Sequence, residues 1–381
     1  MRLAANGILL VVSVATSLLL SEFGARLFLN PADYLSVETV EDDVLGIKVP
    51  PRAAGFDAWG FRNGDVPSRA DIVALGDSHT YGNNAPMADS WPAIVAEQTG
   101  LTVYNLGLGG YGPVQYYELL RTRAFTLRPK IILCAIYMGD DFENAFLMTY
   151  GKDHWATLRR ESGIRADANI WTTPPAGTVS QRFRLWLSRH SVVYRVVVHG
   201  PVLGAVKGAV QIQRAGGSDV DTTTLIDRDA GIQEAFRPAS IRSRVNPRSP
   251  AVREGMRITF ELLRRMDEMA RERGAEFVVV IIPTKETVFA EHLLGNPATY
   301  LRHVVADVVE DETEATRELT AFLDGARIPH VETVRALRSR VAEQLYTKSD
   351  RDMHPGSKGY GVIGQTVAEF LRARVAAGTV H

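Results

Sequence analysis

The chain has 381 residues, of which 45% are hydrophobic and 23% are charged, and its formal net charge is −1. This length and apolar content are sufficient for a large buried core. The balanced charge argues against the broad basic surface of a nucleic-acid-binding protein. The single cysteine, Cys134, excludes an intrachain disulfide and lies in an apolar run that is typical of a buried strand.

The first element in chain order is an uncharged segment from Leu3 to Leu20. A helix needs about 20 apolar residues to cross the hydrocarbon core of a bilayer, and this segment approaches that length. The residues from Ser21 to Phe28 continue a helical pattern, whereas a cleaved signal peptide would end in small residues before an open, polar segment. We therefore expect an uncleaved membrane anchor over residues 1–28. Arg2 and Arg26 flank the span and give little indication of its orientation.

Residues 29–70 are predicted to be an irregular lead-in to the first strand. Val73 to Leu75 then form a short apolar run that stops at Gly76-Asp77-Ser78. This pattern predicts a buried strand, and it places Ser78 at the carboxyl end of that strand, where open α/β sheets bind their ligands. A serine becomes a strong nucleophile only when an imidazole accepts its proton.

Two further turns follow predicted strands. The strand from Thr102 to Leu106 leads into a glycine-rich turn over residues 107–112, and the strand from Ile131 to Tyr137 leads into Gly139-Asp140-Asp141. In a glycine turn no Cβ intervenes, so a backbone N–H group can approach a substrate oxygen closely. These turns are therefore candidates for contacts with a reacting carbonyl group.

Residues 151–255 differ in composition from their surroundings. The part from Phe183 to Val210 is apolar and basic, and the part from Arg214 to Arg253 is rich in glycine, serine, aspartate and arginine. We expect an inserted lid or subdomain whose polar half is partly disordered. Its tryptophans could stack on sugar rings or simply pack within the insertion; they are Trp155, Trp171 and Trp186.

Residues 256–381 continue the alternation of helices and strands. Apolar residues recur at helical spacing from Ile258 to Met269, and strands are predicted for Phe277 to Pro283 and for Ile328 to Val331. Such alternation predicts a doubly wound parallel sheet with its active site across the carboxyl ends of the strands. Late in the chain, Asp352-Met353-His354 offers a base and a carboxylate that could orient it.

Together these four blocks resemble the SGNH, or GDSL-type, hydrolases: a Gly-Asp-Ser turn at Ser78, a glycine turn at Gly110, a third turn at Asp140 and a late Asp/His block, in the order of that family. The resemblance spans roughly residues 45–372. It implies a flavodoxin-like three-layer α/β sandwich that needs no cofactor, formed by residues 71–150 and 256–381. Ser78 would be the nucleophile, His354 its base and Asp352 the partner of His354. The Ser78 and Gly110 backbone N–H groups and the side chain at position 140 would face the oxyanion.

Two departures from the family pattern have chemical consequences. The family carries asparagine where this chain has Asp140, and the loss of one oxyanion donor typically costs ~10²–10³ in turnover. Asp140 is therefore protonated, turned away or a sign of altered activity. In addition, Asp352 lies two residues before His354, where many members place the aspartate three before. The shorter spacing also occurs in relatives that act on exopolysaccharides, and Asp350 is the alternative partner for His354.

Two other residues are candidates for substrate binding. His79 follows the nucleophile and could contact the substrate or simply pack, and Lys285 follows a strand at the catalytic edge, where it could meet a polar substrate or face solvent. The remaining histidines, among them His154, His190 and His330, have no spacing that suggests a metal site.

The sequence thus predicts a membrane-anchored serine esterase that removes an acyl group, with acetyl as the first candidate, from an extracytoplasmic glycan. The outward-facing catalytic domain is what the resemblance implies, because relatives with this layout are usually periplasmic or surface-exposed. One alternative is an O-acetyltransferase of exopolysaccharide assembly, which would use the same acyl-enzyme and a sugar hydroxyl as acceptor. The other is a glycan-binding module that has lost catalysis, for which Asp140 is the best argument.

Overall fold

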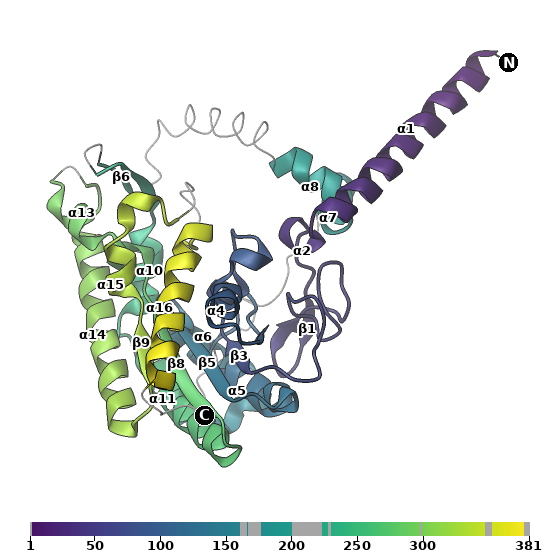
Figure 1. Cartoon of the computed structure of the whole chain (residues 1–381). Coiled ribbons are helices and arrows are strands. Elements are labelled where there is room, and N and C mark those ends of the chain that lie inside the picture. The colour runs from purple at the N-terminus through teal and green to yellow at the C-terminus, as the bar shows by residue number, and fades with distance from the viewer. Residues whose placement is uncertain are drawn as a thin grey trace. The chain divides into compact units, whose positions relative to one another are not determined.

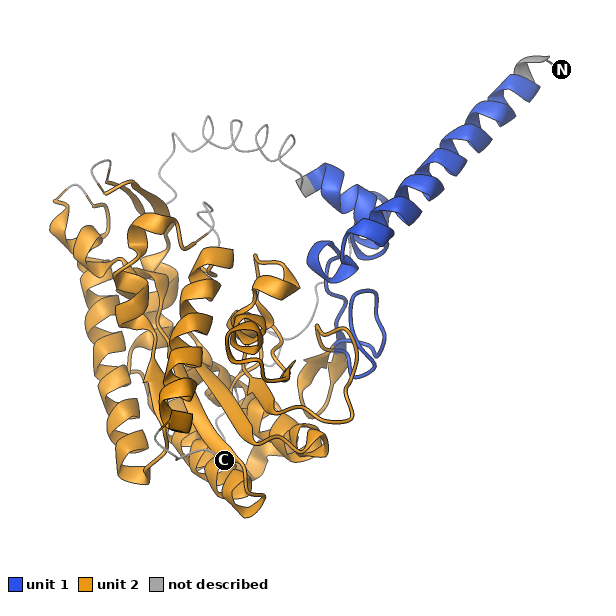
Figure 2. Ribbon diagram, viewed as in Figure 1, with its two compact units in different colours: residues 1–40, 49–60, 173–218 blue, residues 41–48, 61–172, 219–381 orange. Residues whose placement is uncertain are grey.

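The computed structural model describes residues 2–160, 166, 177–199, 223–227, 230–297, 299–346 and 353–376. Within them the chain divides into two compact units, which are coloured separately in Figure 2. The larger unit comprises residues 41–48, 61–172 and 219–381, and the smaller comprises residues 1–40, 49–60 and 173–218.

The larger unit contains a parallel sheet of five strands. Its order is β4-β3-β5-β8-β9 (Figure 1), and the strands are β3 (Ile72–Leu75), β4 (Val103–Asn105), β5 (Ile131–Tyr137), β8 (Glu276–Ile282) and β9 (His330–Glu332). Numbered along the chain, this is the order 2-1-3-4-5 of flavodoxin-like folds, in which the first strand lies beside the third. The predicted doubly wound parallel sheet is therefore confirmed. The strand order reverses between β3 and β5, so the carboxyl end of β3 lies at this topological switch point.

Helices cover both faces of this sheet. The helices of the larger unit are α3 (Ser78–Tyr81), α4 (Trp91–Thr99), α5 (Pro113–Thr122), α6 (Asp141–Gly151), α10 (Pro238–Val245), α11 (Pro250–Glu272), α12 (Lys285–Val288), α13 (Ala290–Gly295), α14 (Arg302–Ala326), α15 (Val334–Arg338) and α16 (Ser357–Ala376). Helices α4 and α16 pack together on one face, while α5, α6 and α11 pack together on the other. The result is the expected three-layer sandwich.

The core explains why the predicted strands are so apolar. All seven residues of β5 are buried, because side chains on both faces of a central strand point into helix layers. On the α4 and α16 side, Trp91 and Tyr360 fill the core. On the opposite side Gly255 of α11 lies against α6, since a Cβ at this position would lie 1.7 Å from the Phe142 carbonyl oxygen. Only glycine lets the two helices approach this closely.

The segment expected to be an insertion contributes more ordered structure to the larger unit than its composition indicated. An antiparallel hairpin forms from β6 (Thr223–Asp227) and β7 (Ile232–Phe236), and its inward side chains Leu225, Ile232 and Phe236 join the main core. Helix α10 follows, and α11 begins at Pro250, ahead of the boundary at 255. The polar composition concealed these elements because only every second hairpin residue is buried.

The lead-in contains short elements rather than a long irregular stretch. These are helix α2 (Pro31–Tyr34) and a two-stranded ribbon of β1 (Val40–Asp42) and β2 (Gly46–Lys48). The smaller unit consists of α1 (Arg2–Phe28), α2, α7 (Val179–His190) and α8 (Val192–His199), together with the loop over residues 49–60. Within the described residues, α1 is a helix long and apolar enough to cross a membrane, over Ala5–Phe28.

Candidate active site

The turn that carries Ser78, the predicted nucleophile, begins where β3 ends. Gly76 follows Leu75, and a Cβ at position 76 would lie 1.9 Å from the Thr80 hydroxyl, so glycine lets the chain turn sharply into α3. The Asp77 carboxylate accepts a hydrogen bond from the His79 backbone N–H at 2.9 Å and so caps the helix. Ser78 stands at the first position of α3 and remains partly exposed.

The candidate base is in contact with this serine. His354 Nε2 lies 2.7 Å from Ser78 Oγ, although the two residues are 276 positions apart in the sequence. The loop that carries His354 is held on both sides: the Tyr137 hydroxyl contacts Met353 Sδ at 3.5 Å, and a bridge pairs Tyr346 with Pro355. The distance is that of a serine whose proton an imidazole can accept. The proposed orienting residues, Asp352 and Asp350, lie outside the described residues.

The glycine turn lies beside the nucleophile. The Leu108 N–H donates to the Gly76 carbonyl at 3.3 Å, and a Cβ on Gly109 would lie 3.7 Å from the Ser78 Cβ. Gly110 has φ +82°, in the left-handed region that favours glycine, and it is exposed. The turn therefore brings backbone groups close to Ser78, as an oxyanion site requires.

Asp140 is the third predicted element, and it also lies at this site. One oxygen of each of Asp77, Asp140 and Asp141 falls within 4.8 Å of the others. Asp140 Oδ1 is buried without a hydrogen-bond partner among the described residues, and Oδ2 lies 4.0 Å from an Arg244 guanidinium nitrogen. Burial and the nearby Asp77 charge raise the pKa of Asp140 to about 7.

His79 has a different place from the one expected for a substrate contact. Its side chain is 1% exposed, its Nδ1 lies 3.0 Å from Asp77 Oδ2, and its ring stacks on Tyr137 at 3.8 Å between centroids. Burial acts to raise the pKa of Asp77, but the charge and hydrogen bonds of His79 outweigh it, so this pKa lies below its usual value. His79 is thus a buried residue that stabilises the turn carrying Ser78 through its contacts with Asp77 and Tyr137.

The carboxyl groups of Asp77, Asp140 and Asp141 lie too close together for all three to be ionised. His79 holds Asp77 as the carboxylate. Burial and the neighbouring charges of Asp77 and Asp140 raise the pKa of Asp141 well above its usual value, while Asp141 accepts hydrogen bonds from the Tyr116 hydroxyl at 2.8 Å and the Tyr137 N–H at 2.9 Å. With a pKa of about 7, Asp140 is about half protonated at neutral pH, and its protonated form can donate a hydrogen bond as an asparagine would.

Asn83 is a polar residue at this site that the sequence reasoning missed. Its Nδ2 lies 3.5 Å from His354 Nε2, and its backbone N–H donates to the Ser78 carbonyl at 3.1 Å. The two adjacent asparagines after Gly82 indicate a turn and nothing more, so no sequence pattern singles out this amide. The structure adds it as a second polar group beside the imidazole.

Lys285 does not lie with these residues. Its side chain is 1% exposed, its ammonium pairs with Glu234 of β7 at 2.7 Å, and it donates to the Ala235 carbonyl at 3.1 Å. The rings of Phe236 and Tyr346 flank the ammonium at 5.1 and 5.3 Å. Because its ammonium is buried and paired with Glu234, Lys285 is not exposed to a substrate. The predicted substrate contact is therefore replaced by a structural role.

This role leads to a prediction. Replacing both charges together, by Lys285→Met with Glu234→Leu, should leave kcat and KM for an aryl ester within about twofold, because a buried ion pair can often be exchanged for apolar residues. Lys285→Met alone should lower the melting temperature sharply, since it leaves the Glu234 charge buried and unpaired. A large rise in KM for the stable double variant would return Lys285 to the substrate site.

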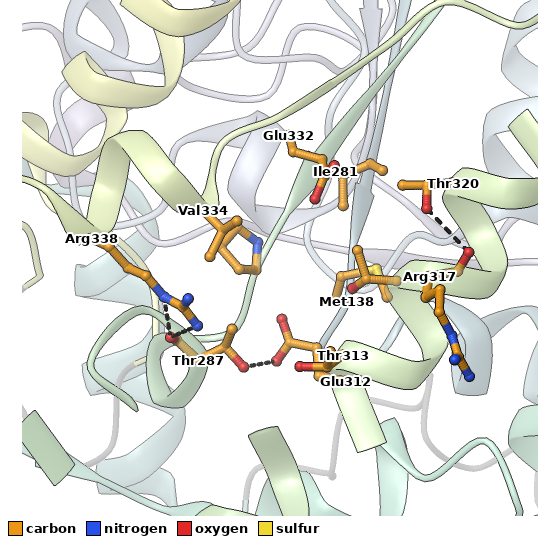
Figure 3. A pocket seen from close by; sticks show the side chains of 12 residues that line it. Met138, Ile281, Thr287, Glu312, Thr313, Arg317, Thr320, Glu332, Val334 and Arg338 are labelled. Atoms are coloured by element: carbon orange, nitrogen blue, oxygen red, sulfur yellow. Dashed lines mark hydrogen bonds between the residues drawn. The ribbon is translucent and has the colours of Figure 1, made fainter. Parts of the chain in front are cut away.

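A cavity of about 310 Å³ lies beyond the carboxyl ends of β8 and β9 (Figure 3). At one side, Glu312 accepts hydrogen bonds from the Thr284 and Thr287 hydroxyls, and burial raises the pKa of Glu312 to about 7. Met138, which precedes the Gly139-Asp140 turn, lines the cavity, but Ser78 and His354 do not. The cavity is therefore separate from the reacting atoms.

Of the tryptophans considered for sugar stacking, Trp155 is 5% exposed and donates to the Val44 carbonyl at 2.8 Å. It is a packing residue. Trp186 is 53% exposed, and Trp171 lies outside the described residues.

Comparisons with known proteins give structural likenesses alone. No family model and no curated protein matches the chain. Three solved structures resemble it: phospholipase A1 from Streptomyces albidoflavus (12% identity, TM-score 0.41, 80% of this chain and 99% of that one), a catalytic mutant of an acetylxylan esterase from Geobacillus stearothermophilus (10%, 0.39, 81% and 94%) and a lipase/acylhydrolase from Enterococcus faecalis (11%, 0.35, 80% and 95%).

Other solved structures that resemble the chain carry names such as GDSL-like lipase and SGNH hydrolase. At such low identity the likeness concerns the fold and says nothing of substrate, so the chemistry has to come from this chain's own residues. By its strand order, its motif order and its fold, the chain is similar to the SGNH-type hydrolases.

Proposed function

We propose that this protein is a serine ester hydrolase that removes an acyl group, acetyl in the first instance, from an extracytoplasmic glycan. The observation that carries the proposal is the 2.7 Å contact between Ser78 Oγ and His354 Nε2 at the carboxyl edge of a parallel sheet. The glycan substrate follows from the resemblance to proteins of exopolysaccharide acetylation.

In the first half of the reaction, Ser78 Oγ attacks the ester carbonyl carbon while its proton moves to His354 Nε2. The carbonyl oxygen becomes an oxyanion, toward which the Ser78 and Gly110 N–H groups and a protonated Asp140 would donate hydrogen bonds. The imidazolium then gives its proton to the departing sugar oxygen, and the C–O bond of the ester breaks. The products are a free hydroxyl on the glycan and an acyl-enzyme at Ser78.

In the second half, His354 takes a proton from water as the water oxygen attacks the acyl carbon. The tetrahedral intermediate collapses, Ser78 Oγ regains its proton from the imidazolium, and the carboxylic acid leaves. The Asp77 carboxylate, whose Oδ2 accepts a hydrogen bond from Ser78 Oγ at 3.3 Å, is a fixed negative charge beside the nucleophile in both steps.

A second candidate is an acyltransferase that passes the same acyl group to a sugar hydroxyl. The observation in its favour is Asp140 Oδ1, which is buried without a partner among the described residues. An ionised Asp140 could position an acceptor hydroxyl for attack through a charge-assisted hydrogen bond, which the neutral side chain of the family's asparagine does not provide.

Product analysis separates the two candidates. The full-length protein is incubated with an acetylated oligosaccharide, with and without an unmodified oligosaccharide as acceptor, and acetate and acetylated products are measured. Hydrolysis predicts acetate release at the same rate in both reactions. Transfer predicts that the acceptor lowers acetate release and gains acetyl groups. Release of neither product, with Ser78 unlabelled by an active-site reagent, would instead support a glycan-binding module without catalysis.

We also propose that α1 anchors the protein in a membrane with the catalytic unit outside the cytoplasm. Its support is the apolar segment over Ala5–Phe28, in which Leu9, Leu10 and Val11 are 65–68% exposed. Such a surface is unfavourable in water, since each exposed apolar side chain forgoes about 1.5–3 kcal/mol of burial.

The anchor predicts that the protein stays with membranes after a high-salt wash and keeps its full mass. A C-terminal reporter that is active only in an oxidising, extracytoplasmic compartment should be active. A soluble form of reduced mass would show that the segment is a cleaved signal, and a silent reporter on a membrane-bound protein would place the catalytic unit on the cytoplasmic side.

A further inference from the structure

Helix α7 presents an aromatic face with no covering partner among the described residues. Val179, Phe183, Trp186 and His190 are spaced by four, three and four residues, which places them on one side of the helix. Val179 is 74% exposed, Phe183 59% and Trp186 53%. The rings of Phe183, Trp186 and His190 stack in sequence, with centroids 6.1 and 5.1 Å apart, so the face is a continuous aromatic strip.

Apart from Leu185 and Leu187, the residues outside this strip are basic or polar. The helix carries Arg182, Arg184 and Arg189 and no acidic residue. Arg189 pairs with Glu38 at 2.9 Å, while Arg182 and Arg184 are exposed. A helix with an aromatic strip, arginines beside it and few other apolar residues is suited to the interface of a bilayer, where aromatic rings lie at headgroup level and arginines meet anionic lipids.

The junction of α7 and α8 is fixed to the carboxyl-terminal end of α1 (Figure 1). Glu22 of α1 accepts hydrogen bonds from the Val192 and Val193 backbone N–H groups at 2.9 and 3.1 Å, and so caps the start of α8. Arg26 of α1 donates to the His190 carbonyl at 2.7 Å, at the end of α7. Two charged residues of α1 therefore hold the junction.

The length of α1 gives the depth of this junction. At 1.5 Å per residue, a hydrocarbon core of about 30 Å takes up about 20 residues. If the uncharged segment that begins at Leu3 lies in that core, Glu22 and Arg26 fall at its boundary. The contacts of Glu22 and Arg26 then place the start of α8 and the end of α7 in the headgroup layer, and they keep both charges engaged there.

We propose that α7 is an interfacial membrane-binding helix, whose aromatic strip of Val179, Phe183, Trp186 and His190 lies in the headgroup region of the bilayer that α1 spans. The surface that the strip binds is a lipid bilayer containing anionic headgroups. This inference rests on the proposed anchoring by α1 and is independent of the proposed esterase chemistry. Its consequence is that the smaller unit is held at the membrane by a second contact beside the span.

The test measures the depth of single nitroxide labels in the full-length protein, reconstituted into vesicles of equimolar phosphatidylcholine and phosphatidylglycerol. The native Cys134 is buried, so labels are placed through Val179→Cys on the strip, Arg184→Cys on the polar side and Leu10→Cys in α1. Collision with oxygen, which is concentrated in lipid, is compared with collision with a water-soluble nickel chelate. We expect the label at 179 to favour oxygen and the label at 184 to favour nickel.

The label at Leu10 separates the two proposals. A lipid-exposed label at 10 with a label at 179 as accessible to nickel as the one at 184 would overturn the inference and leave the anchor intact. A label at 10 in water would overturn the anchor and the inference with it. A label at 179 that responds to added acetylated polysaccharide and not to lipid would identify the strip as a sugar-binding surface and also overturn the inference.

A pair of variants tests the strip itself. Phe183→Ser with Trp186→Ser should move the label at 179 from lipid toward water, because the aromatic rings supply most of the apolar area. Leu185→Ser is the matched control, since Leu185 is also exposed, at 42%, but lies on another side of the helix. The inference fails if the control moves the label as far as the double variant does, or if neither variant moves it.

Discussion

Ser78→Ala is expected to abolish hydrolysis of a short-chain aryl ester, and His354→Ala is expected to do the same. The reason is the 2.7 Å contact between Ser78 Oγ and His354 Nε2: without the hydroxyl no acyl-enzyme forms, and without the imidazole nothing accepts its proton. Loss of a nucleophile or base in such a unit typically costs about 10⁶-fold in kcat. Initial rates of aryl ester hydrolysis measure the effect.

Because the two residues act as one unit, the double variant should be scarcely worse than either single variant. Ser339→Ala and His303→Ala are matched controls, since they make the same substitutions at exposed residues. Circular dichroism checks that each variant keeps its fold. Full activity in Ser78→Ala, or equal losses in the controls, would contradict the assignment.

Asp140→Asn is expected to raise kcat/KM, and the gain should grow with pH. Asp140 can donate a hydrogen bond to the oxyanion only when it is protonated, and its pKa is about 7. Two pH units above that value only about one molecule in a hundred is protonated, so a permanent amide donor would gain about 10²-fold there and little well below pH 7. The wild-type rate should therefore fall as the pH rises above about 7.

A substitution of Arg244 tests the ionisation of Asp140 independently. Its guanidinium lies 4.0 Å from Asp140 Oδ2 and lowers the pKa of Asp140, against the larger effects of burial and Asp77. Arg244→Gln should therefore raise that pKa and shift the alkaline limb of the pH profile upward, whereas it should have no such effect in the Asp140→Asn background. Rate profiles of the two single variants and the double variant make the comparison.

The stability of the folded protein should also depend on the ionisation of Asp140. Since burial raises the pKa of Asp140 from 3.8 to about 7, its contribution to folding becomes less favourable as the pH rises through that interval. The melting temperature of Asp140→Asn should therefore gain on the wild type from about pH 4 to about pH 7, and the difference should then stay constant. Loss of activity in a stable Asp140→Asn variant would indicate that the carboxylate itself is needed, as in the acyltransferase.

The sheet could be predicted from sequence because its strands are buried on both faces. Val73 to Leu75 and Ile131 to Tyr137 read as unbroken apolar runs, and the structure places β3 and β5 there within one residue. The hairpin β6-β7 could not be predicted in the same way, because its buried residues include Thr223 and Glu234 among exposed polar neighbours.

Missing that hairpin also explains the placement of Lys285. The sequence shows no partner for a lysine at the end of a predicted strand. The two hypotheses for Lys285 were therefore a contact with the substrate and exposure to solvent. The buried carboxylate that pairs with it comes from β7, 51 residues earlier. Partners of buried charges depend on tertiary packing, and local sequence carries no record of them.

The candidate site shows the same division. Ser78, Gly110 and Asp140 could be predicted because the turns that follow parallel strands meet at one edge of the sheet, and His354 was predicted from the late Asp/His block of the family that the chain resembles. The pairing of His79 with Asp77 could not, because adjacent polar residues at a turn have many alternatives. Yet this pairing contributes, after burial, to the raised pKa of Asp140, since it keeps a negative charge beside that carboxyl group.

The most direct measurement of the central claim is labelling by a serine-reactive phosphonate, followed by peptide mass spectrometry of the full-length protein. A serine activated by His354 should react at Ser78 alone among the serines of the chain, and His354→Ala should slow the reaction strongly while leaving the fold intact. A label at Ser78 whose rate depends on His354 is the result we predict. No label on a folded protein, or a label at Ser78 that forms equally fast without the imidazole, would contradict the account.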